Sequence, residues 1–437
     1  MIDLPAAWLA AAAGGTLVAG DPEAPGPGRV VVDSREIGPG DLFVGLRGER
    51  EDGGDFAPAA LAAGAWGVLV TPERAPSEGT VIAADDPLAA LGALARAWRR
   101  ELGCRVVGIT GSTGKTSTKD ILSALLRPGA PTHANRENLN TEVGLPLSLL
   151  EAQRGTEIVV LEMAMRGEGQ IADLAAIAEP DVGVIVNVGP VHLELLGTVE
   201  RVAAAKAELI RDLRPGAACV VPGHERLLDA HRRDDLDTWT FGPAGEVRLL
   251  AYEDGTAEIE ARGEHLQLEL PYSEPYNLLN TLAAVAAARA LGRPVGGRVD
   301  VRFSSLRGEV VELPGGVVVV NDCYNANPMS MRAALDHLAE SPAERRIAVL
   351  GPMAELGGGS AGYHRAVGEH AAALGVDVLV PVGEGALAYL EGFDGEVHPV
   401  ATPEEAAALL EEVARPGDRV LVKGSRSAGL ERVLAAA

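Results

Sequence analysis

Cysteine is scarce in this sequence. Only three of the 437 residues are cysteines (Cys104, Cys219 and Cys323), and they are widely spaced with no C-x-x-C pair. This pattern argues against a disulfide framework or a zinc site and favours a cytoplasmic location, where thiols stay reduced. The sequence also lacks an apolar run long enough to cross a bilayer, so we expect no membrane span.

Positive charge is in deficit. There are 38 Lys and Arg residues against 62 Asp and Glu residues, which gives a formal net charge of -24. Such a surface repels nucleic acid and anionic lipid, so we expect neither as a partner, and it favours a monomer. A nucleotide is an anion too, and its site would need basic residues, a helix N-terminus or Mg²⁺ to reverse the local field.

The chain is too long for a single hydrophobic core, and its length suggests about three domains. We predict an α/β protein with a small mixed α/β domain over residues 1–85, a central P-loop ATPase-like parallel-sheet domain over 86–300, and a Rossmann-like doubly wound domain over 301–437. Asp86 and Pro87 are typical of a helix start at the first of these boundaries.

Several segments support this division. Continuous apolar runs at 157–161 and 182–186 are typical of parallel strands that are buried on both faces. Weak alternation over 246–270 indicates a small antiparallel excursion. A strand–helix rhythm follows from 317 onward, and its last helix is predicted over 427–434.

The most informative segment is a glycine-rich turn between an apolar run and a predicted helix. It reads G-x-x-G-K-T, a shortened phosphate loop, because Ile109 occupies the position of the usual first glycine. In such a loop, Lys115 reaches the β- and γ-phosphates and the Thr116 hydroxyl holds Mg²⁺. The loop alone leaves kinase, GTPase, ATPase and ligase open. The residues that we assign to nucleotide binding here are Gly111, Ser112, Thr113, Gly114, Lys115, Thr116 and Ser117.

Three further residues are candidates for chemistry. Glu162 closes a predicted buried strand, where its carboxylate faces the same crevice as the loop and suits Mg²⁺. His192 follows another strand end, and Lys206 lies on a predicted helix. Taken alone, a single His is more often a packing or loop residue, and a helical Lys more often faces solvent.

Taken together, these segments resemble the Mur ligases, the ATP-dependent amide-forming enzymes of peptidoglycan precursor synthesis. The resemblance covers essentially the whole chain. The motifs that carry it are the phosphate loop, Asn138–Pro146, Glu162–Gln170 (with Ala164 where the family usually has Gly), His192–Gly197, Ala205–Glu208, Asp322–Pro328, Pro352–Gly357 (with Pro352 where Asp is common) and Val422–Ser427.

The resemblance implies ATP and two Mg²⁺ ions as cofactors, with one ion near Thr116 and Glu162 and the other near His192 and Lys206. It also implies that Lys206 is carbamylated by CO₂, and that Lys115, His192 and Lys206 are the catalytic residues. Other implied ATP contacts are Asn277 and Asn280 at the adenine and Arg307 and Asp322 at the phosphates and ribose.

The resemblance further implies which substrates are bound. The first domain would hold a UDP group, and the stretch Asp322–Pro328 points to the branch that joins D-alanyl-D-alanine to UDP-N-acetylmuramoyl-tripeptide. The residues implied in substrate binding are Ser34, Arg35, Asn138, Asn140, Thr141 and Arg166.

Two alternatives stay open. One is a sister ligase that adds the third residue or lengthens folate polyglutamate, but Asp322–Pro328 disfavours the former and Asp33-Ser34-Arg35 the latter. The other is a catalytically idle nucleotide-binding scaffold. That class is disfavoured because Lys115 and the candidate metal ligands are all present.

Overall fold

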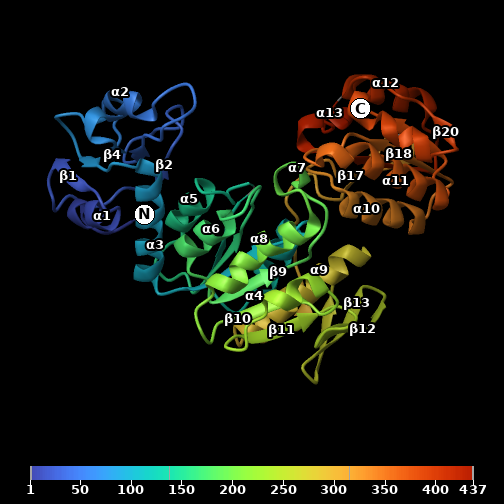
Figure 1. Cartoon of the computed structure of the whole chain (residues 1–437), viewed down its shortest axis with the longest axis horizontal. Helices are drawn as coiled ribbons and strands as arrows, with labels where there is room; N and C mark the ends of the chain where they lie inside the picture. The colour runs from blue at the N-terminus through green and yellow to red at the C-terminus, as the bar shows by residue number, and fades with distance from the viewer. Residues whose placement is uncertain (1, 137, 314, 436–437) are drawn as a thin grey trace.

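The structure, a computed structural model, describes residues 2–136, 138–313 and 315–435. Within these residues the chain forms three sheets of five, ten and six strands, each packed against helices (Figure 1). The first lies in the blue N-terminal part, the second in the green and yellow middle, and the third in the orange and red C-terminal part. The predicted three-domain α/β class is confirmed. None of the helices in the described segments is both long and apolar enough to cross a membrane.

The N-terminal sheet has the strand order β1-β5-β4-β3-β2. Strand β1 runs antiparallel to β5, and the other neighbours are parallel. Strands and helices together give this part of the chain the mixed α/β character that the sequence predicts. Its strands are β1 (Thr16–Ala19), β2 (Val30–Val31), β3 (Leu42–Val44), β4 (Gly67–Val70) and β5 (Val81–Ala83), and its helices are α1 (Ala6–Ala12) and α2 (Ala57–Ala62).

Helix α3 (Pro87–Leu102) leads from this sheet into the central domain. The Asp86 carboxylate caps it by accepting from the backbone N–H groups of Leu88 and Ala89 at 2.9 and 3.1 Å. Trp98 is fully buried, and its indole N–H donates to the Ala152 carbonyl at 2.9 Å. The helix start predicted at Asp86 is therefore confirmed.

We expect Asp86→Ala to destabilise the protein by about 1 kcal/mol, because it leaves two helix N–H groups without their cap. For a domain of this size the unfolding midpoint should fall by about 2–4 °C, which calorimetry would measure. Asp85→Ala is the matched control, since Asp85 is an exposed carboxylate beside the cap. Equal shifts for the two variants would contradict the capping role.

The central sheet has the order β15-β14-β13-β12-β11-β10-β9-β6-β8-β7. The pairings from β7 through β12 are parallel, whereas β12, β13 and β14 form the predicted antiparallel excursion. The strands are β6 (Arg105–Thr110), β7 (Thr132–Ala134), β8 (Ile158–Glu162), β9 (Val182–Ile185), β10 (Ala218–Pro222), β11 (Asp237–Phe241), β12 (Val247–Glu253), β13 (Thr256–Ala261), β14 (Glu264–Glu269) and β15 (Gly297–Arg298).

Helices cover both faces of this sheet and create two apolar layers. Helices α3, α5, α6 and α8 contribute to one layer, and α4 and α9 contribute to the other. The chain passes from β6 outward to β7 and β8 on one side and then to β9 on the other, so the strand order reverses at β6. Ligands of open α/β sheets bind at such a point. The helices are α4 (Lys115–Leu126), α5 (Gly144–Glu151), α6 (Gln170–Ala178), α7 (Leu193–Leu196), α8 (Val199–Asp212) and α9 (Pro275–Ala290).

The C-terminal sheet has the order β16-β17-β21-β18-β19-β20, and only the edge pair β16–β17 is antiparallel among its described pairings. Helices α10 and α11 pack on one face and α12 and α13 on the other, as predicted for a doubly wound sheet. The elements are β16 (Glu309–Leu313), β17 (Val317–Asn321), β18 (Arg345–Leu350), β19 (Val378–Pro381), β20 (Glu396–Val397), β21 (Asp418–Lys423), α10 (Pro328–Glu340), α11 (Ser360–Ala373), α12 (Pro403–Val413) and α13 (Arg432–Ala435).

The single helix predicted over 427–434 is wrong. The structure has a short 3₁₀ turn at Arg426–Ala428 and a separate helix, α13. Gly429 lies between them with φ +62°, a left-handed conformation that a continuous α-helix does not contain.

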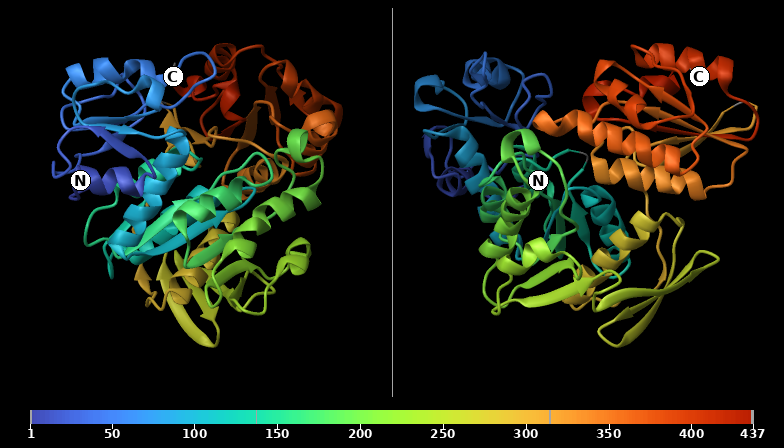
Figure 2. Two further views of the ribbon diagram at one scale, coloured as in Figure 1. Left: turned by 60° about the vertical axis from the view of Figure 1, so that its left-hand side comes forward. Right: turned by 45° about the vertical axis from the view of Figure 1, so that its right-hand side comes forward.

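The C-terminal domain contacts the central domain near the glycine-rich loop after β6, and Figure 2 shows the two side by side from two further directions. The Asn327 amide donates to the Ser112 carbonyl at 3.4 Å. A Cβ placed on Gly189 would lie only 1.8 Å from Sδ of Met329, so the absence of a side chain at 189 makes room for that methionine. The segment between β15 and β16, which joins the central and C-terminal domains, is also held in place. The Asp120 carboxylate accepts hydrogen bonds from the backbone N–H and the hydroxyl of Ser304 at 2.9 and 3.0 Å.

Candidate active site

The phosphate loop joins the central strand β6 to helix α4. Gly114 has φ +76°, and a Cβ at this position would lie 2.5 Å from Oδ1 of Asn280, so glycine is required for both conformation and space. Lys115 begins the helix, and its Nζ donates to the Gly111 carbonyl at 3.0 Å. Burial lowers the pKa of Lys115, and the charge of Arg307 acts in the same direction, while Glu162 opposes both.

Asn187, in the loop after β9, holds the phosphate loop in shape. Its Oδ1 accepts from the backbone N–H groups of Ser112 and Thr113 at 3.0 and 2.9 Å, and its Nδ2 donates to the Thr113 carbonyl at 3.1 Å. The first N–H groups of α4, including those of Lys115, Thr116 and Ser117, have no partner within the helix and form an anion-binding end.

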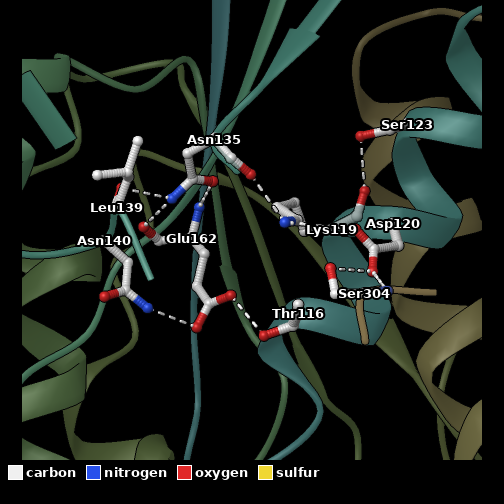
Figure 3. A network of polar contacts seen from close by, with 9 residues as sticks. All are labelled: Thr116, Lys119, Asp120, Ser123, Asn135, Leu139, Asn140, Glu162 and Ser304. Atoms are coloured by element: carbon white, nitrogen blue, oxygen red, sulfur yellow. Dashed lines mark hydrogen bonds and ion pairs between the residues drawn. The ribbon is translucent and has the colours of Figure 1, made fainter. Parts of the chain in front are cut away.

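Thr116 and Glu162 meet at the carboxyl ends of β6 and β8. The Thr116 hydroxyl donates to Glu162 Oε2 at 2.6 Å, and the Asn140 amide donates to Glu162 Oε1 at 2.9 Å (Figure 3). Thr116 and Glu162 are each 2 % exposed. The predicted pairing of a loop hydroxyl with a strand-end carboxylate is therefore present in the structure.

Asn135 is a functional candidate that the sequence analysis missed. Its side chain accepts from the Glu162 N–H at 2.9 Å and donates to the Leu139 carbonyl at 2.8 Å, while Lys119 Nζ donates to the Asn135 carbonyl at 2.8 Å (Figure 3). Both Asn135 and Lys119 are almost completely buried. These contacts fix the backbone of Glu162 and the loop that carries Asn140.

Lys206, on α8, is 1 % exposed. In the described part of the chain, its ammonium group forms no hydrogen bond, and no carboxylate lies close enough to form an ion pair with it. Burial places its pKa well below the ordinary value, and the neighbouring charge of Lys115 lowers it further. The structure thus brings Lys206 near the phosphate-loop lysine, as an amine that is easily held neutral.

His192 lies in the loop before α7 and contacts the C-terminal domain. Its Nδ1 is hydrogen-bonded to Glu355, and this contact lowers the pKa of Glu355. Arg166 Nε lies 3.4 Å from the other oxygen of the same carboxylate. Across the described segments, no hydrogen bond joins His192 to Lys206, and no three His, Cys, Asp or Glu side chains gather to hold a metal by themselves.

The residues predicted for adenine, ribose and phosphates lie on two domains. Asn277 and Asn280 are buried in the first turns of α9, and their side chains are 3.4 Å apart. Arg307 stacks over the Tyr324 ring at 4.1 Å, and Nε of Arg307 is a buried donor that lacks a partner among the described atoms. Asp322 forms an ion pair with Lys423, a buried lysine to which the sequence analysis assigned no role.

The predicted substrate residues are spread between the N-terminal and central domains. Ser34 and Arg35 line a hollow of about 370 Å³ in the N-terminal domain. Arg35 is paired with Asp33 and lowers the pKa of that carboxyl to about 2. Asn138 and Thr141 are exposed in the loop before α5. Among these residues, in the part of the chain that the structure describes, Asn140 is the one hydrogen-bonded to a candidate metal ligand, Glu162.

Three family models match successive parts of the chain. They are described as Mur ligase family, catalytic domain (residues 29–99), Mur ligase middle domain (109–288) and Mur ligase, glutamate ligase domain (306–426).

Individual relatives match over nearly their whole length. A UDP-N-acetylmuramoyl-tripeptide–D-alanyl-D-alanine ligase of Synechocystis is 37% identical, with 93% of this chain and 90% of that protein covered. The crystal structure of MurF from Acinetobacter baumannii has a TM-score of 0.89 at 29% identity and covers 99% of this chain and 98% of that chain. The MurF ligase from Thermotoga maritima in complex with ADP has a TM-score of 0.83 at 34% identity, with 93% and 96% covered.

Proposed function

This chain belongs to the Mur ligase family, and we propose on that basis that it joins D-alanyl-D-alanine to UDP-N-acetylmuramoyl-tripeptide in an ATP-dependent reaction of peptidoglycan precursor synthesis. The observation that carries the proposal is the set of Lys115, Thr116 and Glu162 at the edge where the strand order reverses. Relatives of that name match the chain across all three sheets.

The proposed reaction has two steps. The terminal carboxylate of the tripeptide attacks the γ-phosphorus of ATP, ADP leaves, and an acyl phosphate forms. The free amine of D-alanyl-D-alanine then attacks the acyl carbon, an amide bond forms as the nitrogen loses one proton, and inorganic phosphate leaves with the electron pair of the broken C–O bond. Lys115 and the N-terminus of α4 would neutralise the phosphates while one anion attacks another.

The residues around Thr116 fit a magnesium ion. Thr116 and Glu162 present a hydroxyl and a carboxylate 2.6 Å apart, which are the hard oxygen donors that Mg²⁺ takes beside substrate phosphates. We propose that these two residues hold one Mg²⁺ and that His192 and Lys206 hold a second. When bound, the ions supply positive charge to the transferring phosphoryl group.

Lys206 fits the second site only after modification. A protonated lysine repels Mg²⁺, whereas its neutral amine adds to CO₂ and, after loss of one proton, forms a carbamate with one negative charge shared by two oxygen donors. The burial of Lys206 favours the neutral amine. We therefore propose that Lys206 is carbamylated.

The other site residues take their proposed roles from their positions. The hollow beside Ser34 and Arg35 would bind the UDP group, and Asn138, Asn140, Thr141 and Arg166 would line the path of the muramoyl peptide toward Glu162. Asn277, Asn280, Arg307 and Asp322 would hold ATP between the central and C-terminal domains. We also propose that the protein acts as a cytoplasmic monomer, with domain boundaries near residues 85 and 300.

The test is phosphate release with ATP, Mg²⁺ and UDP-muramoyl tripeptide, with and without D-alanyl-D-alanine. We expect release that requires both substrates, and a product that is heavier by the dipeptide. Diaminopimelate, lysine and glutamate serve as competing amines, each with its own donor substrate. Release with one of these alone would move the enzyme to a sister activity, and ATP binding without release would favour the idle scaffold.

A further inference from the structure

His192 and Glu355 face each other across the boundary between the central and C-terminal domains. They are 163 positions apart in the sequence, and Nδ1 of the imidazole is hydrogen-bonded to Oε2 of the carboxylate. The other oxygen, Oε1, faces Arg166 Nε at 3.4 Å. The Glu355 carboxylate therefore contacts two residues of the central domain, one at each of its oxygens.

The backbone at this contact is unusual on both sides. His192 has φ +53° and Glu355 has φ +62°, in the left-handed region that residues other than glycine rarely adopt. The Glu194 N–H also donates to the Glu355 carbonyl at 3.2 Å. Strained residues that persist in a fold are often functional, and here two of them touch each other.

The loop that presents Glu355 is fixed within the C-terminal domain. The Met353 N–H donates to His364 Nε2 at 2.9 Å, and the Ala354 N–H donates to Ser425 Oγ at 2.9 Å. His364 is itself held, because its Nδ1 contacts the Ser360 carbonyl at 2.8 Å. These bonds fix, within the C-terminal domain, the backbone of the loop that carries Glu355.

We propose that Glu355 is a positioning residue that holds the ring of His192 from the other domain. This inference rests on the proposed metal role of His192. With its proton on Nδ1 and donated to Glu355, the imidazole keeps the lone pair of Nε2 for a metal ion. A carboxylate behind a metal-binding histidine fixes the ring and its tautomer and makes it a better ligand.

The placement of Glu355 has a further consequence. The carboxylate belongs to the C-terminal domain, so it holds His192 only while that domain is docked on the central one. Docking would thereby prepare the second metal site at the same time as it brings Arg307 and Asp322 toward the phosphate loop. Arg166 completes the arrangement by balancing the charge of Glu355.

Binding of Mn²⁺ to the full chain, followed by electron paramagnetic resonance without substrates, tests this inference. The site in question is defined as the one lost in His192→Ala. We expect Glu355→Ala to lower the affinity of that site for Mn²⁺ by about 10–100-fold. Glu355→Gln should recover part of the loss, because its amide oxygen still accepts from Nδ1. The control is Glu194→Ala, which removes an exposed carboxylate two positions from His192. This variant should bind Mn²⁺ with the affinity of the unchanged protein.

A second readout follows the ring itself. In metal-free protein labelled with ¹⁵N-histidine, His192 should carry its proton on Nδ1, and Glu355→Ala should shift the proton toward Nε2. A change in the unfolding midpoint alone, with Mn²⁺ affinity and tautomer unaltered in Glu355→Ala, would overturn the inference and leave a purely structural contact. If His192→Ala binds Mn²⁺ like the unchanged protein, the metal role of His192 fails, and the inference fails with it.

Discussion

Replacing Lys115 with alanine is expected to lower the rate of substrate-dependent phosphate release by a factor on the order of 10³. The structure places its ammonium group beside the Gly111 carbonyl and within the electrostatic influence of Glu162 and Arg307. Transfer of a phosphoryl group to a carboxylate brings anions together, and a half-buried cation that is already in place stabilises the transition state more than a fully solvated one. A phosphate-release assay at saturating ATP measures the effect.

A matched control exists on the same helix. Arg127 is exposed at the C-terminal end of α4, so Arg127→Ala removes one positive charge far from the phosphate end. We expect this variant to keep nearly full activity. A rate for Lys115→Ala within tenfold of the unchanged enzyme would show that the loop does not act through this lysine.

The phosphate loop and its metal partner could be predicted because both are local patterns. The G-x-x-G-K-T turn follows a buried strand and opens a helix, and Glu162 ends a second buried strand. Parallel strands in one sheet bring their carboxyl ends to a common edge, so two local predictions were enough to place Thr116 beside Glu162.

Asn135 could not be predicted in the same way. It follows β7, a strand of only three residues at the sheet edge that has no clear alternation. Its role depends on the pairing of β7 with β8, which brings it to Glu162, 27 positions away. The spacing of Asn135 and Glu162 in the sequence does not predict that they are in contact.

One overlooked signal was the rarity of lysine. Only four of the 38 basic residues are lysines (Lys115, Lys119, Lys206 and Lys423), and the last three are each 98 % buried or more. A chain that uses arginine almost everywhere else keeps lysine where a compact ammonium or a reactive amine is needed. This bias would have drawn attention to Lys119 and Lys423, which hold Asn135 and Asp322.

The contact of His192 with Glu355 depends on how two domains meet, which no periodicity in the sequence encodes. The motif around each residue resembles the family, yet neither motif indicates the other as its partner. The structure therefore adds the contact between the two domains, which the sequence alone did not indicate. The C-terminal domain supplies one side chain to the central domain's histidine and another to the backbone of the phosphate loop.

Lys206→Ala is expected to reduce activity on the order of 10²–10³-fold, because it removes the group that we propose to supply two oxygen donors and one negative charge to a metal ion. Bicarbonate or formate at high concentration should restore part of the activity in this variant, since a small carboxylate can enter the space that the side chain leaves. In the unchanged protein, ¹³C-labelled CO₂ should give a carbamate signal by NMR that is absent from Lys206→Ala.

The variant Lys206→Arg distinguishes a role of Lys206 as a cation from its proposed role as a carbamate. A guanidinium keeps the positive charge and much of the volume, but it stays protonated in proteins and so offers no free amine to CO₂. If Lys206 acted as a cation toward the phosphates, the arginine variant would retain much of the activity and bicarbonate would have no effect on the alanine variant. If Lys206 acts as a carbamate, the arginine variant should be as inactive as the alanine variant. Formate should not restore its activity, because the arginine side chain fills the space that formate would enter. Full activity in Lys206→Ala would exclude both roles, and the second metal site would then need another ligand.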